Sequence, residues 1–212
     1  LQTDATLKSA KKSNSKNGYP LTIRQLSTGI TYSLPYVSKY ALSKEGGLFS
    51  AFSNGNDSTI QKGVYVFDIE SPGFKPVFEG KGDYHTLGLS ESGKQITFVV
   101  DTDTTKAVER NPGLYYWQKG STRASLLLDK TTAAMPTGWQ VNLHQETIFS
   151  KDDQQIYLFV NPAPIQQDTS LLEDEIVNVE VWSYNDPRLH TQQKVDAKND
   201  RKKGYKLVFD VS

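Results

Sequence analysis

Three histidines are the side chains of this sequence best suited to acid–base or binding chemistry near neutral pH. His85 directly precedes a segment predicted as an inner β-strand, residues 86–89, and His144 follows another, residues 139–143. His190 lies apart from both. His85 and His144 are therefore candidates for substrate contact. A polar residue at a strand end is the simpler alternative.

The carboxylates Glu173, Asp174 and Glu175 form a compact acidic cluster before a predicted strand, residues 176–182. Such oxygens can bind calcium or a substrate ammonium group. The cluster lacks the alternating oxygens around a glycine that a calcium loop uses, and a solvated acidic loop is the other interpretation. We expect a weak substrate contact here at most, and neither a metal nor a cofactor.

Motifs for catalysis are missing from the sequence. It contains no G-x-S-x-G elbow, no glycine-rich phosphate loop and no H-E-x-x-H segment. It also contains no cysteine, which excludes disulfides, thiolate metal sites and cysteine nucleophiles. We therefore predict no catalytic residue within these 212 residues.

Composition and charge exclude several classes of protein. The chain is 36% hydrophobic and 11% aromatic, which is typical of a globular protein. Its formal net charge is zero, so no overall field attracts nucleic acid. No apolar run approaches the roughly 20 residues that span a bilayer. We expect neither nucleic-acid binding nor a membrane span.

An internal repeat predicts the architecture. LSKEGGLFSAFS from Leu42, LSESGKQITFVV from Leu89 and FSKDDQQIYLFV from Phe149 align without gaps. Each segment has a serine, a tight turn and then an alternating strand. The serines hydrogen-bond the turn more readily than they act as nucleophiles. They are Ser43, Ser90 and Ser150.

A second landmark follows each turn. GVYVFDIESP begins at Gly63, GLYYWQKGST at Gly113 and NVEVWSYNDP at Asn178, and outer strands are predicted at residues 76–78 and 126–128. The repeat length matches a four-stranded propeller blade, and period-2 patterning argues against a helical solenoid. The sequence predicts an all-β fold, a partial β-propeller of about three to four four-stranded antiparallel blades.

The ends of the chain depart from the repeat. Residues 1–20 are predicted to be a polar arm or inter-blade loop, and residues 21–212 to be the partial propeller, a fragment of a longer chain. LTIRQLSTGITYSLP from Leu21 is predicted to complete a preceding blade, and GYKLVFDVS from Gly204 to begin the next. A short helix is possible over residues 190–199.

Aromatic and aliphatic side chains of the strands are expected to fill the space between blades. The triplet Tyr115, Tyr116 and Trp117 has a ligand platform as its alternative role, although core packing is the simpler interpretation. The expected core residues are Phe52, Val66, Phe67, Phe98, Tyr116, Trp117, Leu158, Phe159 and Trp182.

The turns LSESGKQITF and FSKDDQQIYLF resemble the S-x-D-G-k-x-I-x-F blades of prolyl oligopeptidase-type and TolB-like propellers. Residues 138–193 contain a "GW" strand, an "FS-x-D" turn, an "AP" loop with an acidic stretch and a "V-x-VW-x-x-x-D" strand. This order resembles the N-terminal propeller region of Bacteroidetes-type peptidases of the prolyl oligopeptidase family, similar to dipeptidyl and acylaminoacyl peptidases. Asp153 stands where the family's turn has glycine.

The resemblance implies a serine peptidase whose C-terminal α/β-hydrolase domain lies outside this chain. The propeller would gate and position peptide substrates for that domain, in an exported, periplasmic protein. The glutamates that bind the substrate amine in dipeptidyl peptidases occur in a D-W-x-Y-E-E-E context. Glu173 and Glu175 lack that context, so the role is not transferred. The alternative is a TolB-like scaffold that docks a protein partner.

An arc of blades leaves its terminal faces and edges uncovered. Tyr205 and Phe209 lie near one such end. We therefore expect self-association, either through the terminal blade faces or through addition of residues 205–211 to another sheet.

Overall fold

The structure, a computed structural model, describes residues 17–56, 58–103, 105, 110–164 and 183–211. The expected polar arm falls almost wholly outside this part of the chain, and so do the Glu173–Asp174–Glu175 cluster and Trp182. The described elements are β1 (Tyr19–Arg24), β2 (Thr31–Leu42), β3 (Leu48–Ser53), β4 (Gly63–Asp68), β5 (Phe74–Glu79), β6 (Asp83–Leu89), β7 (Gln95–Asp101), β8 (Gly113–Gln118), β9 (Ser125–Leu128), β10 (Trp139–Val141), β11 (Ile148–Phe149), β12 (Gln155–Pro162), α2 (His190–Asp200) and β13 (Tyr205–Asp210).

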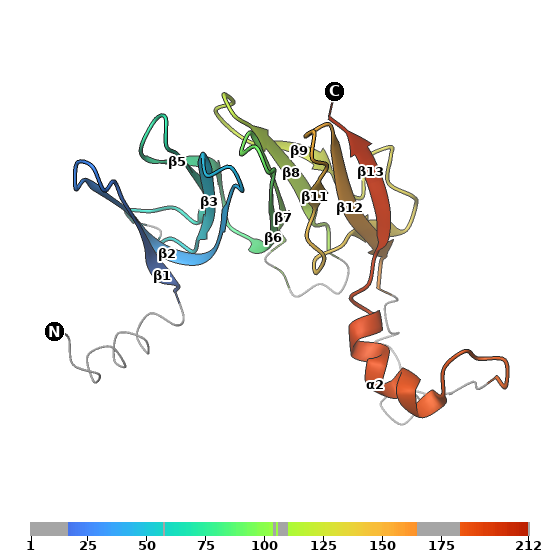
Figure 1. Cartoon of the computed structure of the whole chain (residues 1–212). Helices are drawn as coiled ribbons and strands as arrows, with labels where there is room; N and C mark the ends of the chain where they lie inside the picture. The colour runs from blue at the N-terminus through green and yellow to red at the C-terminus, as the bar shows by residue number, and fades with distance from the viewer. Residues whose placement is uncertain (1–16, 57, 104, 106–109, 165–182, 212) are drawn as a thin grey trace, which may run out of the picture.

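Three antiparallel sheets follow one another along the chain (Figure 1). The first has the order β1-β2-β3-β4-β5, and the second has the order β6-β7-β8-β9. In the third, β10 and β11 both pair with one edge of β12, and β13 pairs with the other edge. The all-β, partial-propeller prediction is confirmed, with three sheets as consecutive blades.

Alternating side chains pack the sheets face to face. One buried cluster joins Phe52 and Val66 of the first sheet to Phe98 and Trp117 of the second. Another joins the second sheet to the third and includes Leu158. Phe52, Val66, Phe67, Phe98, Trp117 and Leu158 are buried as expected, whereas Tyr116 and Phe159 are half-buried.

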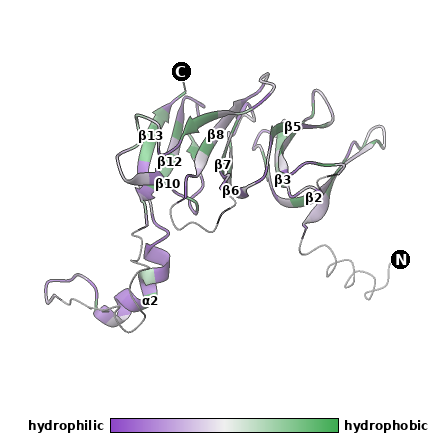
Figure 2. Cartoon of the chain, turned by 180° about the vertical axis from the view of Figure 1, so that it is seen from behind, coloured by the Kyte–Doolittle hydropathy of each residue, from purple (hydrophilic) through white to green (hydrophobic). Residues whose placement is uncertain are grey.

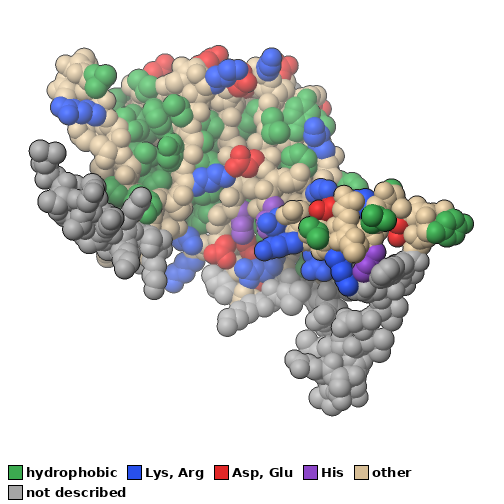
Figure 3. Space-filling view, turned by 60° about the horizontal axis from the view of Figure 1, so that its bottom comes forward, with side chains coloured by type: hydrophobic (Ala, Val, Ile, Leu, Met, Phe, Trp, Pro, Cys, Tyr) green, Lys and Arg blue, Asp and Glu red, His purple; other side chains and the backbone are tan. Residues whose placement is uncertain are grey.

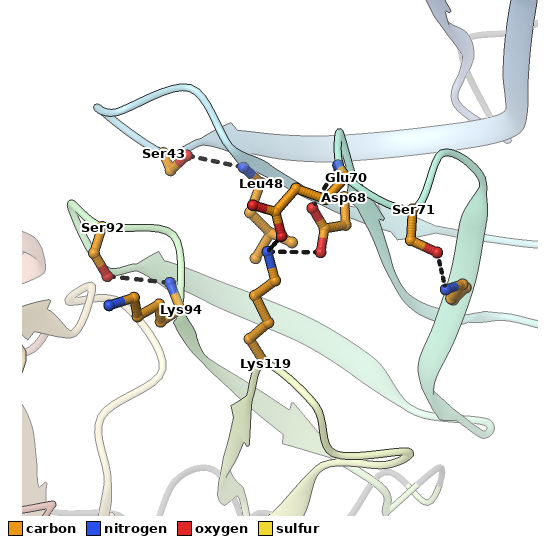
Figure 4. Close-up of polar contacts among 9 residues, drawn as sticks. Ser43, Leu48, Asp68, Glu70, Ser71, Ser92, Lys94 and Lys119 are labelled. Atoms are coloured by element: carbon orange, nitrogen blue, oxygen red, sulfur yellow. Dashed lines mark hydrogen bonds and ion pairs between the residues drawn. The ribbon is translucent and has the colours of Figure 1, made fainter.

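The repeated serines hold their turns as predicted. The Oγ of Ser43 accepts a hydrogen bond from the backbone N–H of Leu48 at 3.0 Å (Figure 4). The Oγ of Ser90 accepts one from Gln95 N–H at 3.1 Å, and that of Ser150 one from Gln155 N–H at 2.9 Å. Each turn thus fixes the start of the strand that follows it.

Adjacent turns also contact each other. A Cβ at Gly93 would lie 2.9 Å from the Oγ of Ser43, and the glycine has φ +74°. The corresponding residue of the third turn, Asp153, keeps a positive φ of 58° and accepts a hydrogen bond from Ser92. Aspartate replaces glycine there because its short carboxylate tolerates this conformation and binds the neighbouring turn.

The segment from Leu21, predicted to complete a preceding blade, forms a hairpin whose second strand continues into the first sheet. β2 runs without interruption from Thr31 to Leu42, so it pairs with β1 along its first half and with β3 along its second half. Tyr36 has φ 60°, and the β2–β3 register shifts between Val37 and Lys39. These irregularities bend the strand, which joins the hairpin to the first sheet.

The segment from Gly204 was expected in a following blade, and that expectation is wrong. β13 pairs with β12 in the third sheet, with Leu158 opposite Leu207. It takes the place that the repeat assigned to the strand from Asn178, which lies outside the described residues apart from its last positions. The two segments alternate similarly in sequence, and sequence order alone does not decide which of them pairs with β12.

The helix expected at residues 190–199 is α2, and it buries none of its residues. Figure 2 shows that it is hydrophilic along nearly its whole length, below the third sheet. Arg188 pairs with Asp200 at 2.8 Å, so ion pairs rather than packing hold the segment. Within the described residues, no helix is long and apolar enough to cross a membrane.

Candidate functional site

A β-bulge in β6, the inner strand of the middle sheet, changes the direction of the His85 and Thr86 side chains. In the β6–β7 ladder, Tyr84 faces Val100 and Leu87 faces Phe98, so His85 and Thr86 together oppose one residue. Bulges of this kind often redirect side chains next to functional sites. Both residues lie toward the end of the blades opposite the serine turns, because β6 runs from Asp83 to the turn at Ser90.

Arg110 lies at the same end and is held by two acidic residues. Its Nε is 2.6 Å from the Oδ2 of Asp101, a carboxylate only 1% exposed, and its Nη2 is 3.6 Å from the Oδ2 of Asp83. Its Nη1 donates to the backbone carbonyl of Thr105. Asp101 ends β7, so a rigid central strand positions the guanidinium.

Burial lowers the pKa of His85 below its usual value of 6.5. The negative charges of Asp83 and Asp101 oppose this shift, whereas His144 and Arg110 reinforce it. The Nε2 of His85 is buried and has no hydrogen-bond partner among the described residues. Burial therefore favours the neutral form of this imidazole.

The third sheet brings His144 to this site through a break in its inner strand. β10 and β11 are separated by six residues, in which the Oδ1 of Asn142 accepts hydrogen bonds from His144 N–H at 2.8 Å and Gln145 N–H at 2.9 Å. In the same loop, Glu146 forms an ion pair with Lys39 of β2. The inner strands of the first and third sheets are thus linked across the middle sheet.

Figure 3 shows this end of the molecule, where histidine, acidic and basic side chains gather near the middle of the face between areas of hydrophobic side chains. A cleft of about 370 Å³ lies beside Arg110. Its charged lining comprises Lys62, Lys81, Arg110 and Asp83, so cations outnumber anions. We call these four residues together with His85, Asp101 and His144 the axial cluster.

The axial cluster is suited to binding a carboxylate or carbonyl oxygen. Guanidinium and ammonium groups form charge-assisted hydrogen bonds with such oxygens. In the described part of the chain, no group of three His, Cys, Asp or Glu side chains is placed to bind a metal ion.

A second hollow lies between the first two sheets at the serine-turn end. It has a volume of about 630 Å³, a floor that includes Trp117 and a charged rim. Lys119 lies 2.8 Å from both the Oδ2 of Asp68 and the Oε2 of Glu70, and this bridge closes one side (Figure 4). Hydrogen bonding by Lys119 helps to lower the pKa of Asp68, against the opposing effect of its burial.

For Tyr115 and Trp117 of the aromatic triplet, the structure supports core packing. Tyr115 stacks on Phe98 with ring centroids 5.6 Å apart, and Trp117 is 5% exposed. The Nε1 of Trp117 donates to the backbone carbonyl of Ser121 at 2.8 Å. Tyr115 and Trp117 therefore pack between blades.

Of the residues proposed from the sequence, the structure brings His85 and His144 to one site and places His190 at the start of α2. It does not describe the acidic cluster. Sequence reasoning missed Arg110 and Asp101. An aspartate at the end of a fully buried strand was the available signal, because a buried carboxylate needs a cation.

No protein-family model and no curated protein matches the chain. Several solved structures are similar in part. The tricorn protease is 12% identical, with a TM-score of 0.47, over 74% of this chain and 15% of its own. Prolyl oligopeptidase B from Galerina marginata, bound to a 25mer macrocyclization substrate, is 13% identical, with a TM-score of 0.41, over 73% and 29%. TolB from Acinetobacter baumannii is 12% identical, with a TM-score of 0.41, over 69% and 33%.

The chain thus spans a third or less of the length of each of these structures. At such identities the likeness says nothing of activity. The assignment of a partial propeller rests on the three sheets themselves, their order and their face-to-face packing.

Proposed function

We propose that this chain is a non-catalytic propeller segment of a prolyl oligopeptidase-like serine peptidase, and that it gates and positions peptide substrates for a hydrolase domain outside these 212 residues. The sequence resemblance over residues 138–193 motivates the parent enzyme. One structural observation supports a role in peptide contact, namely the cationic cleft lined by Lys62, Lys81 and Arg110.

The expected ligand is a peptide that carries a free carboxylate. Arg110 is oriented by Asp101 and Asp83, so little side-chain freedom is lost when it binds an anion. Lys81 is exposed and lines the same cleft. Together these groups can bind the carboxylate.

Fluorescence anisotropy with labelled tetrapeptides tests this proposal, with a free carboxylate in one peptide and a C-terminal amide in the other. We expect the free acid to bind more tightly. Lys81→Gln and Arg110→Lys should each weaken its binding by about tenfold, as loss of one charge-assisted hydrogen bond predicts. Arg110→Lys keeps a cation beside Asp101, so the fold is preserved while the planar fork is lost.

Arg123→Gln is the matched control, because Arg123 pairs with Glu79 at 3.5 Å on an exposed surface away from the cleft. Its binding should equal that of the unaltered chain. Equal affinity for both peptides, or no binding by the unaltered chain, would contradict a peptide-positioning role.

The parent enzyme is tested separately through the coding gene. A G-x-S-x-G motif several hundred residues downstream of this segment supports the peptidase. A stop codon or a lipid anchor supports instead the TolB-like scaffold that docks a protein. An N-terminal signal sequence in the same gene would support the proposed export to the periplasm, and its absence would count against it.

A further inference from the structure

The hollow between the first two sheets has an apolar floor. Its lining includes four side chains of the buried cluster that joins these sheets, namely Leu48, Val66, Val77 and Trp117. The exposed ring of Pro76 adds to the apolar lining. The volume of about 630 Å³ is in the range of sites that bind small molecules in proteins. The apolar part of a ligand can therefore be buried here.

One side of the rim has a surplus of negative charge. The ammonium group of Lys119 lies 2.8 Å from a carboxylate oxygen of Asp68 and 2.8 Å from one of Glu70 (Figure 4). One lysine thus faces two carboxylates, so the group as a whole is negative. The side chain of Glu70 is 80% exposed, and its carboxylate can bind a second cation without giving up Lys119.

Another part of the lining carries a positive charge without an acidic partner. The ammonium group of Lys75 donates a hydrogen bond to the Oγ of Ser71 at 2.8 Å. Among the described residues, no ion pair involves Lys75, whereas Arg123 of the same lining pairs with Glu79. A neutral hydroxyl holds the ammonium group in place but does not cancel its charge. Lys75 is therefore suited to binding an anion.

We propose that this hollow binds an amino acid or a dipeptide with apolar side chains, in its zwitterionic form. The carboxylate of the ligand contacts Lys75, and its ammonium group contacts the carboxylates of Asp68 and Glu70. The apolar side chain covers the floor. A simple anion would meet the negative side of the rim, and a simple cation would meet Lys75, so neither matches the whole lining.

This site is separate from the axial cluster. The hollow lies at the serine-turn end of the blades, and the axial cluster lies at the opposite end. The two sites share no residue, so the proposal does not rest on the proposed function, and each can fail without the other.

Nuclear magnetic resonance titrations with leucine and leucylleucine test the proposal and compare the two ligand sizes. We expect shifts of the backbone amide signals of residues 120–123 and of the indole Nε1–H of Trp117, which donates to the carbonyl of Ser121 in this loop. N-acetylleucine lacks the ammonium charge, leucinamide lacks the carboxylate and glycine lacks the apolar side chain. Each of these should bind at least about tenfold more weakly than the tighter of the two zwitterions.

Two variants of exposed side chains identify the charged contacts. Lys75→Gln should weaken leucine binding by about tenfold but leave leucinamide binding unchanged, because leucinamide has no carboxylate. Glu70→Gln should weaken leucine binding but leave N-acetylleucine binding unchanged. Lys75→Arg keeps the positive charge and should retain most of the affinity.

Lys81→Gln, which alters the cleft of the axial cluster, is the control and should bind leucine as the unaltered chain does. No shift at residues 120–123 with either zwitterion would overturn the proposal. Binding of N-acetylleucine or leucinamide as tight as that of the zwitterions, or leucine binding that Lys75→Gln does not weaken, would overturn it as well.

Discussion

The first and third sheets differ in how far other residues cover their outward faces. On the first sheet, Leu21 and Leu34 of the β1–β2 hairpin cover Ala51 and Tyr65, and Leu34 is 1% exposed. On the third sheet, Ile148 and Val208 remain 54% and 50% exposed. Within the described part of the chain, residues of the hairpin cover one end of the arc, and the outward face of the third sheet stays exposed.

The difference shows how a blade can be capped without a neighbouring blade. The bend in β2 folds the hairpin over the face of the sheet, and the ring of Tyr32 packs 5.2 Å from that of Phe67. Among the described residues, the third sheet has no such extension, since α2 buries none of its residues.

The largest expected loss of stability comes from truncating a buried side chain of the β1–β2 hairpin. Leu34→Ala should lower the free energy of unfolding by about 3 kcal/mol, because a fully buried leucine leaves a cavity. Val208→Ala on the outward face of the third sheet should change it by less than about 0.5 kcal/mol. Urea denaturation at a concentration where the chain is monomeric measures both. Equal costs would show that the hairpin does not seal the first sheet.

A second pair of variants tests how much the contact between adjacent turns contributes to the free energy of unfolding. Gly93→Ala should cost about 2 kcal/mol, because φ is +74° and the new Cβ would meet Ser43 and Leu48. Gly46→Ala, at φ +78° with nothing within 4 Å, should cost about 1 kcal/mol. The same denaturation assay applies, and a larger cost at Gly46 would contradict turn-to-turn packing.

A smaller effect concerns the middle sheet and depends on pH. Since the folded pKa of His85 is lowered, the unfolded chain binds the proton first as pH falls. The free energy of unfolding should therefore decrease as pH falls below about 6.5, down to the folded pKa. His85→Gln should remove this part of the dependence. His144→Gln, at an exposed position with no such burial, should retain most of it, and the reverse result would contradict the assignment.

The smallest effect is expected from the link between the two ends. Lys39→Ala removes the ion pair with Glu146, whose side chains are 36% and 57% exposed. Exposed pairs of this kind contribute about 0.5 kcal/mol or less. Thermal unfolding of Lys39→Ala and Glu146→Ala, singly and together, measures the coupling. A coupling above about 1 kcal/mol would show that the two end sheets depend on each other.

Much of the fold follows from local pattern. The serine turns, the alternating strands after them and α2 are each specified within about a dozen residues, so the sequence predicts them. The placement of β13 is not local. Residues 178–182 and β13 have similar alternation, and only the tertiary structure decides which of them pairs with β12.

The axial cluster was predicted only in part for the same reason. His85 and His144 were expected at strand ends that face the inner side of the arc, but His85 lies within β6 and is half-buried. The bulge at His85 and Thr86 and the pairing of Arg110 with Asp101 depend on register and on a loop closure. Neither has a sequence spacing from which it could be inferred.

The central claim is that this chain binds peptides through the axial cluster and does not cleave them. The most direct measurement follows binding and hydrolysis of the same free-acid peptide in one preparation, by anisotropy and by chromatography of the products. We predict saturable binding that Lys81→Gln weakens, without release of fragments. Absence of binding, or cleavage that is lost when a residue of this chain is changed, would contradict the account.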